Sequence, residues 1–130
     1  MLRARDAMDR DYAKPLDIPT LARIAYVSEA HFIRTFGATF GETPHRYLQR
    51  RRVERAMFML RETELGVSEI CLEVGFASVG SFGRTFRDIV GKPPTDYRLE
   101  AADLRAVPAC FARAWTRPSS FGEAAARAAG

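Results

Sequence analysis

The stretch that decides the fold runs from Phe32 to Tyr47 and reads Phe-x-Arg-Thr-Phe-x3-Phe-Gly-x2-Pro-x2-Tyr. From Phe82 to Tyr97 the chain reads Phe-x-Arg-Thr-Phe-x3-Val-Gly-x2-Pro-x2-Tyr, so the pattern returns at a constant offset of 50 residues. Upstream, Leu21–Ala22 correspond to Ile70–Cys71 in a register shifted by one, which indicates a longer turn in the second copy. A duplicated small helical unit is one way for a chain to read two neighbouring stretches of a long polymer.

The composition indicates one domain, or two very small ones, with enough apolar residues for a core. The chain has 130 residues, of which 47% are hydrophobic. The sequence holds no apolar run of about 18 residues and begins with no apolar signal-peptide core, so we expect a cytoplasmic protein. Two cysteines, Cys71 and Cys110, make neither a disulfide framework nor a metal cluster. Cys71 falls on an apolar helix face and is expected to be a buried thiol.

Charge is unevenly distributed along the chain. Residues 28–61 carry seven Arg against three Glu, whereas residues 62–104 carry four basic residues against eight acidic ones. Of the 20 basic residues 18 are Arg, which suits bidentate contacts with phosphates and guanine edges, although codon bias is an equally good explanation of that ratio.

The apolar pattern predicts an all-α chain with seven helices, because no segment sustains the period-two alternation of a strand. The expected helices cover about 2–13, 19–25, 29–40, 44–62, 69–74, 79–90 and 94–101. Expected N-caps are Ser28, Thr43, Ser68 and Ser78, and Gly41 and Gly91 suit the left-handed residue that closes a helix. We divide the chain into a first helix-turn-helix subdomain (1–43), a connecting helix (44–62), a second helix-turn-helix subdomain (63–101) and a C-terminal extension (102–130).

The connecting helix sets the distance between the two repeats. Its apolar face is expected to comprise Tyr47, Leu48, Val53, Ala56, Met57 and Leu60. Nineteen residues give a helix of about 28 Å at 1.5 Å per residue, and successive major-groove faces on one side of B-DNA lie about 34 Å apart. Each repeat is a short helix, a tight turn and a longer helix, which is the helix-turn-helix arrangement. A monomer could therefore place two recognition helices about one turn of DNA apart.

One long stretch carries a family resemblance. Val67-Ser-Glu-Ile-Cys-Leu-Glu-Val-Gly-Phe-Ala-Ser78, followed by Ser81-Phe-x-Arg-Thr-Phe86 and Gly91-x-x-Pro94, resembles the signature of the AraC/XylS family of bacterial transcription regulators. The resemblance covers residues 2–100. It implies a seven-helix fold, sequence-specific binding to double-stranded promoter DNA and, usually, activation through contact with RNA polymerase. With Met1 as the native start, the chain resembles the short stand-alone MarA/SoxS-like members, which act as monomers; a trimmed chain would not carry that inference.

In the first unit, Phe32 and Phe36 are spaced as core residues. The resemblance places Ala30, Ile33 and Arg34 at the base-facing positions, with His31 beside them. Arg34 suits a bidentate contact with guanine; a phosphate clamp or a salt bridge to Glu29 is the alternative.

In the second unit the resemblance places Val79, Gly80, Ser81 and Arg84 at the base-facing positions. Gly80 and Gly83 each lower helix stability by about 1 kcal/mol relative to Ala, unless they permit close approach of DNA or of another helix. With the acidic charge of this half, they indicate that the first unit dominates affinity.

Further arginines are candidates for phosphate or polymerase contact: Arg46, Arg50, Arg51, Arg55 and Arg87. Those on the outer face of the connecting helix, namely Arg50, Arg51 and Arg55, are expected to be left largely to solvent or phosphate. Arg52 has a structural interpretation, pairing with an acid such as Glu73.

Two matters stay open from the sequence. Phe111, Trp115 and Phe121 make the tail too apolar for plain disorder, so it packs on the domain, binds a partner or covers a pocket.

No catalytic, metal or cofactor constellation is present, and we predict a protein that is not an enzyme. The strongest enzyme alternative, a DNA-repair methyltransferase, would need a cysteine cluster, and the sequence has none. The serious alternative is an interaction module that binds RNA polymerase first and DNA only weakly.

Overall fold

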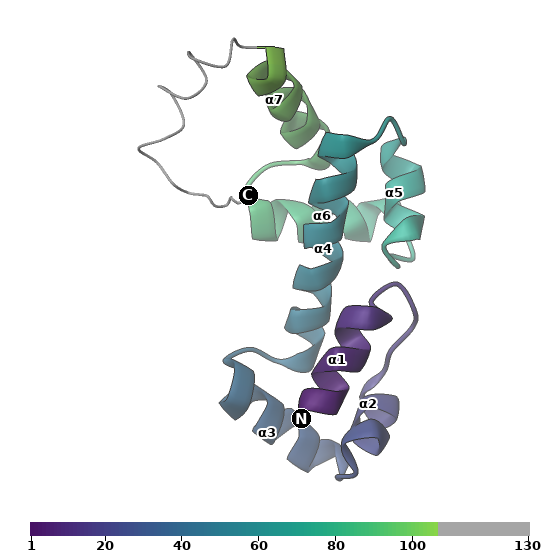
Figure 1. The fold of residues 1–130 in the computed structure, drawn as a ribbon, viewed down its shortest axis with the longest axis vertical. Coiled ribbons are helices and arrows are strands. Elements are labelled where there is room, and N and C mark those ends of the chain that lie inside the picture. Colours follow the sequence, from purple (N-terminus) through teal and green to yellow (C-terminus); the bar gives the residue numbers. More distant parts are fainter. Residues whose placement is uncertain (107–130) are drawn as a thin grey trace. The chain divides into compact units, whose positions relative to one another are not determined.

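The computed structural model describes residues 1–106, which form seven α-helices and no strand (Figure 1). The helices are α1 (Leu2–Arg10), α2 (Ile18–Ala25), α3 (Glu29–Phe40), α4 (Pro44–Glu62), α5 (Val67–Glu73), α6 (Val79–Val90) and α7 (Pro94–Ala106). The predicted all-α, seven-helix fold is thus confirmed. The chain divides into two compact units after Tyr97, and both cores and every contact that follows belong to the first unit, Met1–Tyr97.

Local capping signals explain why the longer helices begin and end where they do. The side-chain oxygens of Ser28, Thr43 and Ser78 each accept a hydrogen bond from the backbone N–H three residues further on, at 3.2, 3.1 and 3.1 Å. Gly41 and Gly91 close α3 and α6 with φ angles of 78° and 95°, a conformation that costs glycine little. These three caps and two closing glycines were all predicted.

Two helix boundaries in the first half differ from the prediction. The first helix ends at Arg10 rather than near residue 13, and the chain then turns, with Lys14 N–H donating to the Asp11 carbonyl at 2.9 Å. The second begins one residue early because Asp17 caps it, accepting from the Thr20 N–H at 2.9 Å.

Two boundaries in the second half differ as well. Ser68 does not cap α5: Gly66 is the N-cap residue, and its N–H donates to the Glu69 carboxylate at 2.9 Å. That is half of a capping box, in which the third helical residue reaches back to the cap. Helix α7 runs on to Ala106, five residues beyond the predicted end at Ala101.

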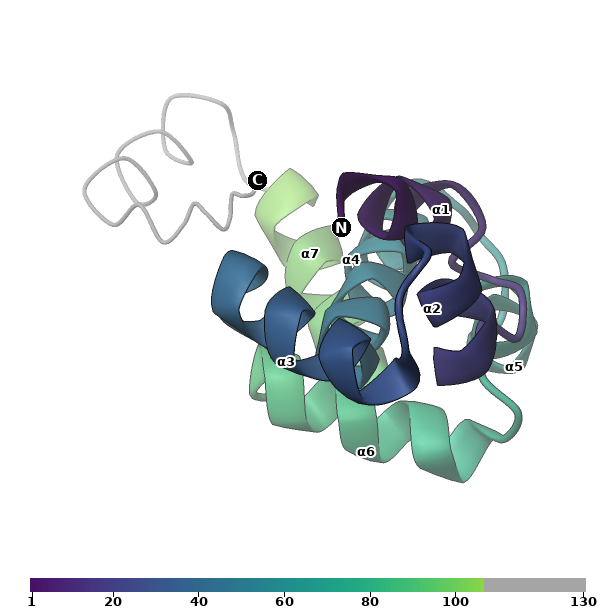
Figure 2. The ribbon, with the colours of Figure 1, turned by 90° about the horizontal axis from the view of Figure 1, so that it is seen from below.

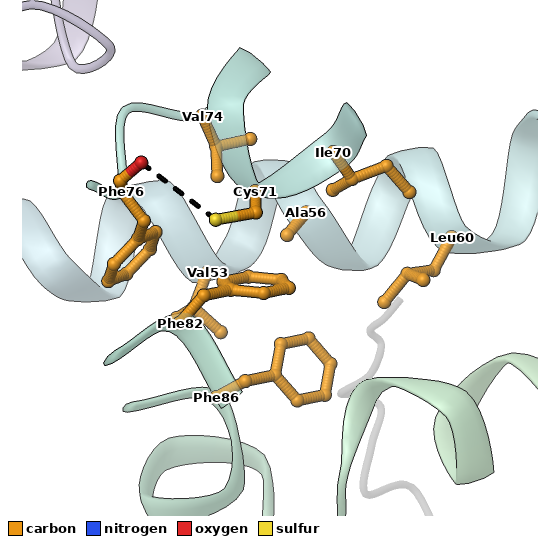
Figure 3. Close-up of a cluster of buried hydrophobic side chains, with 9 residues drawn as sticks. All are labelled: Val53, Ala56, Leu60, Ile70, Cys71, Val74, Phe76, Phe82 and Phe86. Carbon is orange, nitrogen blue, oxygen red and sulfur yellow. Dashed lines mark hydrogen bonds between the residues drawn. The ribbon is translucent and has the colours of Figure 1, made fainter. Parts of the chain in front are cut away.

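The helices enclose two separate hydrophobic cores that share α4. The first core lies among α1, α2, α3 and the start of α4, and comprises Ala4, Met8, Leu21, Ala22, Phe32, Phe36, Tyr47 and Leu48. The second lies among α4, α5 and α6 (Figure 3), and comprises Val53, Ala56, Leu60, Ile70, Cys71, Val74, Phe76, Phe82 and Phe86. The predicted apolar face of α4 is confirmed, with Met57 only partly buried. Each helix-turn-helix unit therefore has its own core, and one rigid helix belongs to both.

Cys71 is a core thiol, as predicted. Its side chain is 1% exposed, and its Sγ donates to the Phe76 carbonyl at 3.8 Å (Figure 3). Burial raises the pKa of this thiol, which keeps it protonated and unreactive. Cys110 and the tail aromatics lie outside the described residues.

Candidate nucleic-acid interface

Helix α3 presents a polar and small-residue face outward because its aromatic residues anchor the opposite face. Phe32 and Phe36 are fully buried, with ring centroids 5.6 Å apart, and Phe36 meets the edge of Tyr47. The four residues predicted to face DNA bases are all exposed: Ala30, His31, Ile33 and Arg34. The structure brings them together on one surface.

Helix α6 repeats this arrangement. Phe82 and Phe86 are fully buried, and Phe86 lies 5.7 Å from the Tyr97 ring, as Phe36 lies near Tyr47. Three of its four predicted base-facing residues, Val79, Gly80 and Arg84, are exposed, whereas Ser81 is half-buried beside the Ser78 cap. A Cβ built on Gly83 meets no atom within 4 Å, so close approach of another described helix does not explain that glycine.

Helices α3 and α6 occupy the same side of the compact unit Met1–Tyr97. Seen from below in Figure 2, α3 and α6 run roughly parallel on one side of α4, and α1 lies on the other. Their outward faces can therefore approach one surface together.

Arg34 and Arg84 occupy equivalent positions of the two repeats. Within residues 1–106 neither guanidinium takes part in an ion pair, so the predicted alternative of a salt bridge from Arg34 to Glu29 does not form. Arg87, also exposed, likewise has no ion pair in this part of the chain. These guanidiniums are available to an anionic ligand.

Two α4 arginines that the sequence assigned to solvent or phosphate are held within the protein instead. Arg50 donates to Glu42 at 2.7 Å and to Glu54 at 2.6 Å, and the hydrogen bond to Glu42 is the main reason that its pKa is raised. Arg51 donates to Asp9 at 3.1 Å and to Glu54 at 2.5 Å. Both side chains are about one-third exposed, so these pairs hold the start of α4 against α1 and the loop before it.

The other arginines of α4 divide into exposed and structural ones. Arg55 is exposed and lies over the Phe58 ring, 4.6 Å from its centroid. Arg46 is exposed and pairs with Asp88 of α6 at 3.1 Å. Both remain reachable by a partner.

Arg52 is structural, as predicted, but its partner is not Glu73. Its Nε donates to the Tyr12 carbonyl at 2.6 Å and its Nη2 to the Lys14 carbonyl at 2.9 Å, while the guanidinium lies 5.9 Å from the Phe76 ring centroid. Burial lowers the pKa of Arg52, although an arginine stays charged at neutral pH. The residue fastens the loop between α1 and α2 to the connecting helix.

A second contact at that loop was not predicted. Gly75, in the turn between α5 and α6, lies so close to Ala13 that an added Cβ would come within 2.8 Å of the Ala13 carbonyl oxygen. Tyr12 packs against both hydrophobic cores. We call residues 11–14 the junction loop, because it joins the two helix-turn-helix units independently of α4.

Comparison with known proteins identifies this arrangement. A family model described as a helix-turn-helix domain matches residues 21–100. The solved structure of the DNA-binding domain of AdpA, a global transcriptional factor, in complex with a target DNA has a TM-score of 0.75 to this chain. It is 28% identical and covers 82% of this chain and 96% of that one. This chain belongs to the AraC-type helix-turn-helix family.

Relatives of this AraC-type domain are bacterial transcription regulators. A Streptomyces lividans protein named as an AraC-like transcription regulator is 36% identical over 95 residues, which cover 73% of this chain and 31% of that protein. The HTH-type transcriptional regulator GbdR of Pseudomonas aeruginosa is 31% identical over 91 residues, which cover 70% of this chain and 25% of GbdR. The chain thus spans about a third or less of these relatives, and the whole proteins' partners do not follow from the match.

The AraC-type domain structure from Chromobacterium violaceum has a TM-score of 0.72 at 28% identity, covering 78% of this chain and 90% of that one. This chain therefore carries an AraC-type DNA-binding domain of a transcription regulator. Among residues 1–106, no helix is long and apolar enough to cross a bilayer.

Proposed function

We propose that this domain reads promoter DNA by placing α3 and α6 in successive major-groove segments of one duplex. The observation that carries the proposal is that Arg34 and Arg84 stand at equivalent, exposed positions on two helices that share one side of the protein. Arginine is the residue that most often reads guanine in the major groove, through two parallel hydrogen bonds.

The two cores support this proposal mechanically. Because α4 belongs to both cores and the junction loop ties them a second time, the distance between α3 and α6 is fixed before DNA is met. A preorganised reader loses little entropy on binding. Residues Ala30, His31, Ile33, Val79, Gly80 and Ser81 then supply apolar or weak polar contacts to the base edges.

The first helix-turn-helix repeat is proposed to supply most of the affinity for DNA. Its recognition face offers Arg34, His31 and the apolar Ile33, whereas α6 offers Arg84 among Val79 and glycines. We further propose a bacterial, cytoplasmic activator that acts as a monomer and touches RNA polymerase, with Arg55 and Arg87 among the exposed candidates for that contact.

Selection of bound duplexes from a random pool tests the proposal. The wild-type domain should recover a site of about 20 base pairs with two unlike halves one helical turn apart. Arg34→Ala and Arg84→Ala should each relax the consensus in one half only and cost about 1–3 kcal/mol, with the larger loss for Arg34→Ala. Arg10→Ala, which removes an exposed charge on α1, is the matched control and should leave the consensus unchanged.

A different result would favour the interaction module. Binding that falls steeply with salt and yields no consensus would show that phosphates alone are contacted. In that event RNA polymerase, and not a DNA sequence, would be the partner that supplies specificity. Equal losses of binding affinity for Arg34→Ala and Arg84→Ala would instead contradict only the proposal that the first helix-turn-helix repeat supplies most of the affinity.

A further inference from the structure

The start of α4 and the middle of α6 together line an open cleft of about 370 Å³. Five of its six lining residues carry side-chain hydrogen-bond donors. The lining residues are His45, Arg46 and Gln49 from α4, and Arg84, Thr85 and Asp88 from α6.

One ion pair crosses this cleft. Arg46 Nη1 donates to Asp88 Oδ2 at 3.1 Å, and the two side chains are 46% and 69% exposed. Exposed pairs of this kind are weakly held, because water screens them and two side chains lose their freedom. Arg46 can therefore exchange this partner for another anion at little cost.

The cleft lies between the two helices that are proposed to enter the major groove. Three residues separate the end of α3 from the start of α4, and α6 is the second proposed recognition helix, so the cleft falls between the two proposed reading surfaces. If both helices enter successive major-groove segments, the strand between those segments runs along this gap. A backbone phosphate is the anion that it brings there.

The chemistry of the lining fits a phosphate except for Asp88. The Arg46 guanidinium, the Gln49 amide and the Thr85 hydroxyl can donate to phosphate oxygens, which are strong acceptors for charged donors, while Arg84 is left to the base contact proposed above. The Asp88 carboxylate repels a phosphate and, in the free protein, already occupies Arg46. Asp88 is thus a competitor of the phosphate for the same guanidinium.

We propose that this cleft binds one DNA backbone phosphate between the two recognition helices, and that binding transfers Arg46 from Asp88 to that phosphate. The proposal rests on the proposed DNA-binding function and adds a residue, Asp88, that lowers affinity. The cost of breaking the pair applies to every phosphate backbone alike, so Asp88 lowers affinity for specific and non-specific sites by the same factor.

Five proteins test this exchange: the wild type, Asp88→Asn, Arg46→Gln, the double variant and Glu73→Gln. Asp88→Asn keeps the size of the side chain and removes its charge. Glu73 is exposed on α5 and is the control for the loss of one acidic charge elsewhere. Binding is measured by fluorescence anisotropy on a 20-base-pair duplex at fixed salt, after unfolding curves show that each variant is folded.

Asp88→Asn should bind DNA about twofold to fivefold more tightly, since it no longer competes for Arg46. Glu73→Gln should stay within about twofold of the wild type, because a distant surface charge is screened. The gain should vanish when Arg46→Gln is added. A gain no larger than that of Glu73→Gln, or one that persists without Arg46, would overturn the proposal.

A chemically altered duplex locates the phosphate. A neutral methylphosphonate scanned along the strand between the half-sites should weaken wild-type binding at one linkage and have little effect there on Arg46→Gln. If every linkage affects the two proteins equally, Arg46 holds no phosphate. Phosphate contacts carry no sequence information, so the anisotropy comparison of the five proteins also runs on a random duplex if no consensus site is recovered. Failure of sequence reading and failure of the cleft are then distinguishable.

Discussion

Replacing Gly75 with alanine tests whether the junction loop truly rests against the turn between α5 and α6. Gly75 has a φ of 96°, and an added Cβ would lie 2.8 Å from the carbonyl oxygen and 2.9 Å from the Cα of Ala13. Gly91 has nearly the same φ, 95°, but meets no atom within 4 Å. The two alanine variants therefore share the backbone strain and differ only in the steric clash.

The structure gives the size of the difference. A side chain in the left-handed region costs about 1–2 kcal/mol at either position. At position 75 the clashing atoms belong to the backbone and cannot rotate away, so the loop has to shift. Overpacking of that kind costs about a further 1–3 kcal/mol. We expect Gly75→Ala to lower the free energy of unfolding by about 2–5 kcal/mol, and Gly91→Ala by about 1–2 kcal/mol.

Urea unfolding followed by far-ultraviolet circular dichroism measures both values. In a domain of about 100 residues each kcal/mol corresponds to about 4–8 °C in Tm, so a thermal melt provides an independent reading. If Gly75→Ala costs no more than Gly91→Ala, the close contact does not exist, and the junction loop is held only by Arg52 and by the packing of Tyr12.

Three further predictions concern the same framework. Ser28→Ala and Ser78→Ala should each cost about 1 kcal/mol of unfolding free energy, whereas Ser68→Ala should cost little because Gly66 and Glu69 cap α5; equal losses in urea would contradict this. Arg52→Met keeps the aliphatic stem but removes two charged hydrogen bonds to carbonyls, and should lower the free energy of unfolding by about 2–4 kcal/mol, which is measured as a lower urea midpoint. An unchanged midpoint would show that Arg52 does not hold the junction loop. Burial, with a hydrogen bond to Asp9, raises the pKa of Tyr47 to about 12, so its stabilising contribution is complete below the unfolded pKa near 10 and is lost as pH rises towards 12; Tyr47→Phe should flatten that fall in a pH series of melts.

The parts of the fold that were predictable are those with local causes. The caps at Ser28, Thr43 and Ser78 and the closing glycines depend on neighbours within a few residues, so the local sequence predicts them directly. The aromatic anchors of α3 and α6 follow from spacing alone. The cap of α5 was misassigned although its signal was present, because Glu69 stands three residues after Gly66 and forms half of a capping box.

Partners chosen across the fold were not predictable. Arg52 bonds backbone carbonyls 40 and 38 residues away, and a carbonyl has no sequence signature because every residue carries one. The contact of Gly75 with Ala13 likewise depends on how two loops meet. The pairing of Arg50 with Glu54 could have been predicted from the sequence, since the two residues are four apart on one helix.

Altering the spacing of the binding site tests the central claim most directly, namely that a rigid frame presents two readers to one duplex. Five base pairs, half a helical turn, are inserted between the two halves of the selected site, and affinity is compared with that for the intact site and for each half alone. Because α4 and the junction loop fix the distance between α3 and α6, the inserted site should bind no better than the stronger half. Binding that tolerates the insertion would show that the two helices do not read DNA as one fixed unit.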